Sequence, residues 1–216
     1  MSSRTADSKI PTTKSLITVI GPIGSGKTTV AKLLAEKLRL PLLDADLFED
    51  NPFLPGFIKD PHRYAFSVEL FFTIKRLKKL KPISSLLKKS SVVIDSGLIM
   101  SRIYTQNQYR QGYLTPAEWD FYQEIVADYQ TALPNPDIIV YLKTKPATQL
   151  ARIRARGRNF ETGYTIGYLT QITDRLEEYV SVIDQQKTKL ITIDTDKVNL
   201  LEEEVQQKLI KKMKSN

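Results

Sequence analysis

A glycine-rich octapeptide near the amino terminus constrains the fold of this chain more than any other feature. Residues 21–28 read Gly-Pro-Ile-Gly-Ser-Gly-Lys-Thr and match the pattern G-x-x-x-x-G-K-[ST]. The apolar run 16–20 before them suits a buried strand of a parallel sheet. Apolar residues at helical spacing follow over 29–40, until Pro41 ends the pattern. A strand, a glycine-rich turn and a helix in this order predict a phosphate-binding loop, and a turn in an unrelated fold is the alternative.

The residue types of this loop each have a physical task. Glycines let the backbone curl so that successive N–H groups face one anion, and the following helix adds the positive end of its dipole. Lys27 would reach the β- and γ-phosphates, and the Thr28 hydroxyl would ligate Mg²⁺. We therefore expect ATP and Mg²⁺ as cofactors. The residues expected to bind the nucleotide are Gly21, Ile23, Gly24, Ser25, Gly26, Lys27, Thr28, Thr29 and Arg152.

Strand and helix patterns alternate along the rest of the chain. Further strands are predicted over 42–43, 91–94, 137–142 and 190–193. Helices are predicted over 61–80, 98–109, 116–132, from Pro146 onward, 165–185 and 200–214. This alternation predicts an α/β fold in which helices flank a five-stranded parallel sheet. Residues 15–216 would form this single domain, and the polar residues 1–14 a flexible tail.

Composition excludes several classes of protein. The chain has no Cys and one His, His62, which excludes a disulfide scaffold and a Cys-ligated zinc or iron–sulfur site. No apolar run approaches the roughly 18 residues of a membrane span, so we expect a cytoplasmic protein. The net charge of +8 indicates an anionic partner: nucleic acid, a lipid surface or a phosphorylated small molecule.

Other motifs that occur with a phosphate-binding loop distinguish the classes of nucleotide-binding enzymes. The chain lacks the Asn-Lys-x-Asp and Asp-x-x-Gly motifs of GTPases. A motor or helicase core is usually larger and has a hydrophobic strand ending in Asp-Glu, whereas this strand ends Ile94-Asp95-Ser96. These features favour a small-molecule kinase.

Four arginines stand around Gly157 and support this interpretation: Arg152, Arg154, Arg156 and Arg158. Phosphoryl transfer needs cations that converge on the moving group, and the planar guanidinium suits its equatorial oxygens. An arginine-rich lid would also exclude water when it closes. A solvated basic helix face is the alternative.

Several segments in the right order resemble the deoxynucleoside kinase family. They are residues 21–29, 49–54, 60–66, 112–115, 118–122, 136–142 and 156–161. The resemblance implies a three-layer phosphate-loop kinase fold with an arginine-rich lid, and transfer of the γ-phosphoryl group to the 5′-hydroxyl of a (deoxy)nucleoside. It also implies a homodimer built through helices beside the long one.

The resemblance implies roles for four catalytic residues. Asp46 stands where the family has a carboxylate, normally Glu, that takes the proton of the 5′-hydroxyl; Asp44 is the second candidate, and an ordinary strand-end turn the alternative. Asp95 would lie near Mg²⁺ together with Thr28. Arg156 and Arg158 would stabilise the transferring group.

The acceptor side departs from the family pattern. Ser96 replaces an Arg that holds the 5′-oxygen, and Ile58 replaces a Tyr that contacts the sugar, although its companion Glu161 remains. Glu69 replaces the Gln that pairs with the base, whereas its partner Arg76 is retained. Ser101 replaces the Asp that holds this Arg in many members. An ionised Glu69 only accepts hydrogen bonds and would favour a donor-rich edge such as that of guanine; alternatively it pairs with Arg76 and reads no base.

Three hypotheses follow. The first is a nucleoside or deoxynucleoside kinase with altered specificity, and the second a kinase of another small acceptor such as a nucleoside monophosphate. The third is an ATP-binding subunit with weakened catalysis. A nucleic-acid-binding module is a minor alternative, because the seven basic residues between Lys75 and Lys89 are expected to form a solvated surface apart from Arg76.

Overall fold

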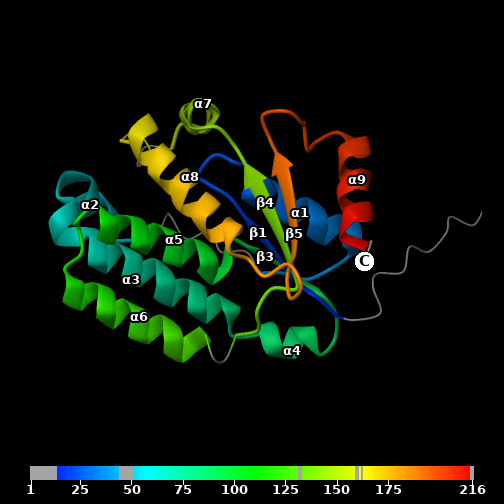
Figure 1. Ribbon diagram of the computed structural model, residues 1–216, viewed down its shortest axis with the longest axis horizontal. Coiled ribbons are helices and arrows are strands. Elements are labelled where there is room, and N and C mark those ends of the chain that lie inside the picture. Colours follow the sequence, from blue (N-terminus) through cyan, green and yellow to red (C-terminus); the bar gives the residue numbers. More distant parts are fainter. Residues whose placement is uncertain (1–13, 44–50, 131–132, 159–160, 162, 215–216) are drawn as a thin grey trace, which may run out of the picture.

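The protein is built on one parallel sheet covered by helices on both faces. The computed structural model describes residues 14–43, 51–130, 133–158, 161 and 163–214. All strand pairs are parallel, and the order is β2-β3-β1-β4-β5. The strands are β1 (Leu16–Ile20), β2 (Leu42–Leu43), β3 (Val92–Asp95), β4 (Ile138–Lys143) and β5 (Lys189–Asp194). The predicted five-stranded parallel sheet is confirmed (Figure 1).

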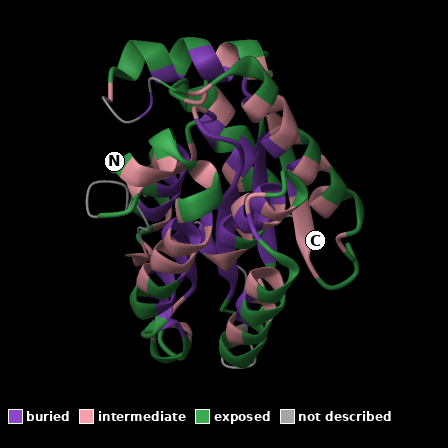
Figure 2. Ribbon diagram, turned by 90° about the vertical axis from the view of Figure 1, so that its left-hand side faces the viewer, coloured by how far each residue is buried: buried purple, intermediate pink, exposed green. Residues whose placement is uncertain are grey.

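The central strand β1 shows why these apolar runs form a sheet buried on both faces. All five of its residues are buried between β3 and β4. Ile17 and Val19 pack against one helical layer, whereas Leu16 and Ile20 face the other. Buried residues accordingly concentrate in the middle of the molecule (Figure 2). The sheet places the ends of β1 and β3 side by side, with Val19 paired to Asp95.

Helices complete the layers on the two faces of the sheet. The helices are α1 (Lys27–Leu38), α2 (Leu54–Lys59), α3 (Pro61–Leu80), α4 (Ile83–Leu87), α5 (Gly97–Arg110), α6 (Pro116–Gln130), α7 (Pro146–Arg156), α8 (Ile166–Ser181) and α9 (Glu203–Lys214). Helices α1 and α9 share a core with one face, and α5 and α8 with the other. In Figure 1, α3 and α6 lie outside α5, which packs on the sheet.

The long helix α3 is predicted correctly from end to end. Pro61 occupies its first turn, where the missing N–H costs nothing, and the Asp60 carboxylate accepts a 3.2 Å hydrogen bond from the backbone N–H of Arg63. Its buried face carries Glu69 and Arg76, which are two turns apart. One helix thus carries both predicted base readers.

Several helix boundaries differ from the prediction. Helix α1 ends at Leu38 instead of the predicted Leu40, because Arg39 adopts a left-handed conformation and its N–H caps the helix. Helix α8 ends at Ser181, four residues short of the predicted end at 185, and α9 begins at Glu203 instead of 200. The short helices α2 and α4 were not predicted. Helices of five or six residues are too short to show a helical period in the sequence.

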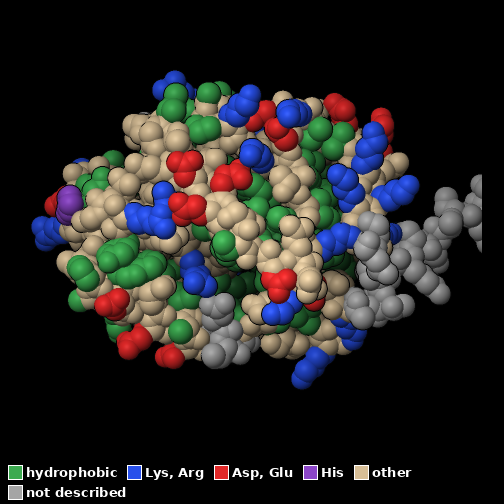
Figure 3. All heavy atoms as spheres, in the orientation of Figure 1, with side chains coloured by type: hydrophobic (Ala, Val, Ile, Leu, Met, Phe, Trp, Pro, Cys, Tyr) green, Lys and Arg blue, Asp and Glu red, His purple; other side chains and the backbone are tan. Residues whose placement is uncertain are grey.

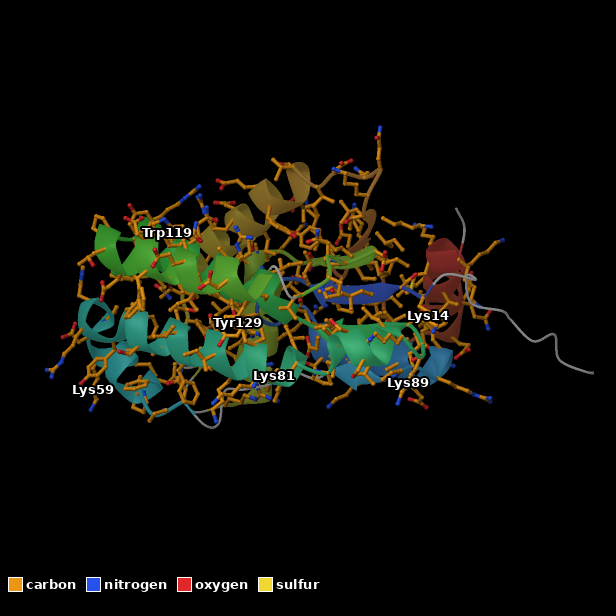
Figure 4. All side chains as sticks on the ribbon, turned by 90° about the horizontal axis from the view of Figure 1, so that it is seen from below. Lys14, Lys59, Lys81, Lys89, Trp119 and Tyr129 are labelled. Carbon is orange, nitrogen blue, oxygen red and sulfur yellow. The ribbon has the colours of Figure 1, made fainter. Side chains whose placement is uncertain are left out.

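The basic residues between Lys75 and Lys89 differ in how far they are exposed to solvent. Within 75–89, Arg76 is buried, whereas Lys78, Lys79, Lys81, Lys88 and Lys89 are exposed. Lys81 and Lys89 lie well apart on either side of α4 (Figure 4). Another group of lysines gathers around α9 (Figure 3). No described helix is both long and apolar enough to cross a bilayer.

Candidate active site

The glycine-rich loop connects β1 to α1 and packs closely on α7. Gly24 has φ +77°, and a Cβ atom there would lie 2.8 Å from the backbone oxygen of Gln149. Only glycine satisfies both the conformation and the close approach. The Lys27 ammonium donates a 2.8 Å hydrogen bond to the carbonyl of Pro22, at the start of the loop. The ammonium therefore lies over the loop backbone, where a phosphate would be held.

Thr28 and Asp95 meet at the open end of the sheet. The Thr28 hydroxyl donates a 2.5 Å hydrogen bond to Oδ2 of Asp95, and the Ser96 hydroxyl donates one of 2.9 Å to Oδ1. Asp95 is only 3% exposed. The two residues predicted to ligate Mg²⁺ are therefore in direct contact, although they come from different elements.

The donor set at this point fits magnesium and phosphate. A hydroxyl and a carboxylate oxygen are the hard ligands that Mg²⁺ takes, with phosphates and water completing its octahedron. The described residues contain no cluster of three or more His, Asp or Glu, so the protein would contribute few ligands. The buried hydroxyl of Ser25 has no hydrogen-bond partner, which leaves it available to an anion in the loop. These residues fit a magnesium-bound triphosphate.

Arg152 joins the loop to the segment that follows β5. Its guanidinium donates to Oγ1 and the carbonyl of Thr195, at 3.0 and 2.9 Å, and to the carbonyl of Gly24 at 3.4 Å. A cavity lies beside these contacts, between Gly24–Gly26 and residues 195–202. Arg152 thus links the phosphate loop to the segment after β5, and these two segments line the cavity on the nucleotide side of the site.

Arg156 and Glu161 form an ion pair at the end of α7. The Arg156 Nε donates a 3.0 Å hydrogen bond to Glu161 Oε2, and a second N–H donates to Oε1. Arg158 lies 4.0 Å from the same carboxylate. The Glu161 side chain is 2% exposed, whereas that of Arg156 is 37% exposed. The structure therefore brings three predicted site residues together through one buried carboxylate.

A separate cavity lies between α3, α5 and the start of α8, with a volume of about 60 Å³. Its lining residues are Ile23, Leu54, Phe57, Val68, Glu69, Phe72, Arg76, Tyr104, Gln108, Tyr164 and Tyr168. Arg76 donates a hydrogen bond to the Ser101 hydroxyl, so the Ser that replaces the family Asp still contacts this arginine. Glu69 accepts a 3.4 Å hydrogen bond from Nε2 of Gln108. Among the described residues Glu69 and Arg76 form no direct ion pair, although each lies in the other's field.

Burial controls the ionisation of this cavity. It raises the pKa of Glu69 from 4.5 to about 7, while the hydrogen bond from Gln108 and the charge of Arg76 act in the opposite direction. Burial likewise raises the pKa values of Tyr104, Tyr164 and Tyr168, so these phenols stay neutral at physiological pH. Glu69 is the group of this cavity whose charge changes near neutrality.

Three residues that the sequence analysis singled out on the acceptor side are not among the described residues that line the acceptor cavity. Asp46 and its alternative Asp44 fall outside the described residues. Ile58, in place of the family Tyr, is 50% exposed on α2 and is absent from the lining of the acceptor cavity.

Gln108 lines the acceptor cavity but was not predicted from the sequence. The signal was present, because Ser101, Thr105 and Gln108 repeat at helical spacing on the buried face of α5.

Comparisons with known proteins agree on one family. A family profile described as "Deoxynucleoside kinase" matches residues 17–216. The chain is 33% identical over 187 residues to a deoxyguanosine kinase of Bacillus subtilis (strain 168), covering 85% of this chain and 88% of that protein. It is 30% identical over 197 residues to a deoxyguanosine kinase of Lactobacillus johnsonii, covering 88% and 86%. The fold matches the structure of deoxyadenosine kinase from M. mycoides with bound dATP, with a TM-score of 0.76, 20% identity and coverage of 91% and 99%.

Proposed function

The chain belongs to the deoxynucleoside kinase family and phosphorylates deoxynucleosides, and on that premise we propose that it transfers the γ-phosphoryl group of ATP to the 5′-hydroxyl of a purine deoxynucleoside. The contact between Thr28 and Asp95 beside the phosphate loop carries this proposal. The purine class is supported by relatives named deoxyguanosine kinase. The rings of Tyr104, Tyr164 and Tyr168 in the wall of the acceptor cavity offer flat aromatic surfaces to a base.

The loop and lid residues bind and orient the donor. Backbone N–H groups at the start of α1 and the Lys27 ammonium hold the phosphates, while the Thr28 hydroxyl and the Asp95 carboxylate hold the metal. Mg²⁺ bound there neutralises charge on the phosphate oxygens. Arg156, held by the buried Glu161 with 37% of its side chain exposed, would direct its guanidinium at the transferring group.

The acceptor side positions the sugar and the base. Asp46, just after the second predicted strand, takes the proton from the 5′-hydroxyl as that oxygen attacks. As the resemblance implies, Glu161 would accept a hydrogen bond from the sugar 3′-hydroxyl. Glu69 and Arg76, which line the acceptor cavity, would contact the base. Ser96 holds Asp95 instead of supplying the family's arginine cation, so Arg156 and Arg158 carry more of the charge stabilisation.

A substrate panel tests this function directly. Wild-type protein would be incubated with γ-labelled ATP, Mg²⁺ and each common nucleoside, deoxynucleoside and monophosphate in turn. The expected products are 5′-monophosphates of purine deoxynucleosides, absent with a Lys27→Ala variant. Phosphorylation of monophosphates alone would support the second kinase hypothesis, and ATP binding without any product would support a subunit with weakened catalysis.

We also propose a homodimer. The resemblance places the dimer contact on helices beside α3, and α6 exposes the large apolar residues Phe121 and Tyr129, which are 52% and 49% exposed. Light scattering should give twice the chain mass of 24.7 kDa. A monomer mass at micromolar concentration would contradict this proposal.

A further inference from the structure

The acceptor cavity contains two buried polar atoms whose hydrogen-bonding capacity is unused. Nε of Arg76 is a donor without an acceptor, and Oε1 of Gln108 is an acceptor without a donor. Arg76 is 8% exposed and Gln108 1% exposed. A buried polar atom left without a partner costs about 1–3 kcal/mol. Because both residues line the same cavity, a ligand that satisfies both atoms is the simplest explanation for their retention there.

The orientation of the Gln108 amide follows from Glu69. An ionised carboxylate only accepts hydrogen bonds, so the amide must turn its Nε2 donor toward Glu69, and the observed contact is 3.4 Å. The carbonyl Oε1 of the same amide is left unpaired. The cavity thus has two acceptors, the Glu69 carboxylate on α3 and Oε1 of Gln108 on α5.

The charges of the cavity define a pattern that a base must complement. Glu69 and Gln108 Oε1 are two acceptors from α3 and α5, and Arg76 supplies a donor from α3 two turns away from Glu69. A complementary base presents two neighbouring donors and a separate acceptor. Guanine does so with N1–H and its exocyclic N2 amino group beside O6 and N7. Adenine has an unprotonated N1 and no amino group at C2, so its N1 lone pair would face the carboxylate.

We infer that Glu69 and Gln108 form an acceptor pair that reads the N1–H and N2 amino edge of guanine, and that Gln108 is a specificity-determining residue of this kinase. Arg76 donates its free N–H to O6 or N7 of the same base. The inference rests on the proposed function, because the base must be that of the acceptor nucleoside. It extends that function from purine deoxynucleosides to deoxyguanosine and assigns the discrimination to two named side chains.

The wild-type protein tests the inference without any substitution. Values of kcat/KM would be measured for deoxyguanosine, deoxyinosine and deoxyadenosine. Deoxyinosine lacks only the N2 amino group, so it isolates the contact to Gln108. Since a hydrogen bond to a charged or buried acceptor contributes roughly tenfold to hundredfold, we expect deoxyguanosine to exceed deoxyinosine by about tenfold. We expect it to exceed deoxyadenosine by about a hundredfold or more.

Two variants then locate the discrimination. Glu69→Gln should lower the preference for deoxyguanosine over deoxyadenosine by at least about tenfold, because the amide offers adenine N1 a donor. Gln108→Leu, of similar size, should bring the deoxyguanosine to deoxyinosine ratio close to one. The loss should appear as a raised KM for deoxyguanosine with kcat little changed, since the base contacts are the same before and during transfer. Glu124→Gln and Gln111→Leu make the same chemical changes at exposed positions on α6 and after α5, and should leave all ratios unchanged.

The outcomes separate this inference from the function on which it rests. Equal use of deoxyguanosine and deoxyinosine by the wild type would overturn the role of Gln108. A Glu69→Gln variant with unaltered base preference would overturn the role of Glu69. In both cases a deoxynucleoside kinase would remain. Absence of any phosphorylated deoxynucleoside would instead overturn the proposed function and the inference together.

Discussion

The hydroxyl of Thr28 lies 2.5 Å from a carboxylate oxygen of Asp95, a residue 67 positions further along the chain. The parallel pairing of β1 with β3 makes this contact, because it aligns the loop after β1 with the end of β3. Both residues were singled out from the sequence as magnesium ligands. Because these two oxygens already meet, Thr28 and Asp95 are placed to hold Mg²⁺ and would supply it with a hydroxyl and a carboxylate oxygen.

Replacing Asp95 with Asn should reduce kcat by about a hundredfold and shift the magnesium dependence of the reaction to higher concentrations. The substitution keeps the shape of the side chain but removes the charge that attracts the cation, and losses of this size are typical when one electrostatic contact to a transition state is removed. Initial rates over a range of Mg²⁺ concentrations would measure both effects. Asp120→Asn, at an exposed position of α6, is the matched control. An Asp95→Asn protein with an unchanged magnesium profile would remove Asp95 from the site.

Gly24→Ala should destabilise the protein more than Gly26→Ala. Both glycines have positive φ, at +77° and +93°, so each alanine costs about 1 kcal/mol of strain. At Gly24 the new methyl group would also lie 2.8 Å from a backbone oxygen of α7, whereas nothing lies within 4 Å at Gly26. Thermal unfolding without nucleotide would compare the two variants. Equal midpoints would show that the loop does not depend on its close packing against α7.

Arg156→Ala should lower kcat by about a hundredfold or more, and Arg154→Ala should have little effect. Arg156 is held by the buried Glu161, whereas Arg154 is exposed on the same helix. The two arginines therefore differ in placement and not in charge. An arginine that stabilises a transferring phosphoryl group is worth about a thousandfold or more in well-studied cases. Parallel losses in both variants would indicate a general basic surface instead of a positioned guanidinium.

The affinity for deoxyguanosine should fall as the pH drops through about 7. The groups that face Glu69 are Arg76 on α3, Tyr104, Thr105 and Gln108 on α5, and Tyr164 and Tyr168 near α8. Burial holds the pKa of Glu69 at about 7. Below that pH the protonated carboxyl loses its acceptor charge, so KM for deoxyguanosine should rise from pH 8 to pH 6. The Glu69→Gln variant should show a flat profile over this range, and a wild-type profile without slope would contradict the assignment.

The ionisation of Glu69 that should strengthen binding of deoxyguanosine should also lower the free energy of unfolding as the pH rises. Because the folded pKa of Glu69 is raised above 4.5, its contribution to stability is complete below pH 4.5 and is lost as the pH rises through about 7. The cost of the buried charge is therefore fully present at pH 8. The Glu69→Gln variant should be more stable than the wild type there by about 3 kcal/mol, and this difference should fall to less than about 1 kcal/mol at pH 5. Urea unfolding at both pH values would measure it, and a less stable variant at pH 8 would contradict the burial argument.

The parts of the fold that were predicted are those that local patterns determine. The phosphate loop, the apolar strands and α3 each carry their signal within one segment, as Asp60 and Pro61 do at the start of α3. Helix α1 ended earlier than predicted because Arg39 adopts the left-handed conformation usually left to glycine. The role of Gln108 was missed because it depends on a contact with Glu69, which lies 39 residues away on another helix. Pairings of this kind arise from the packing of α3 on α5 and leave only a faint periodic signal in either segment.

The transfer of label from γ-labelled ATP to deoxyguanosine tests the central claim most directly. Wild-type protein with Mg²⁺ should place the label on the 5′-oxygen, giving deoxyguanosine 5′-monophosphate, and should give no such product with an analogue that lacks the 5′-hydroxyl. Label found only in inorganic phosphate, or no transfer to any deoxynucleoside by protein that binds ATP, would contradict the account.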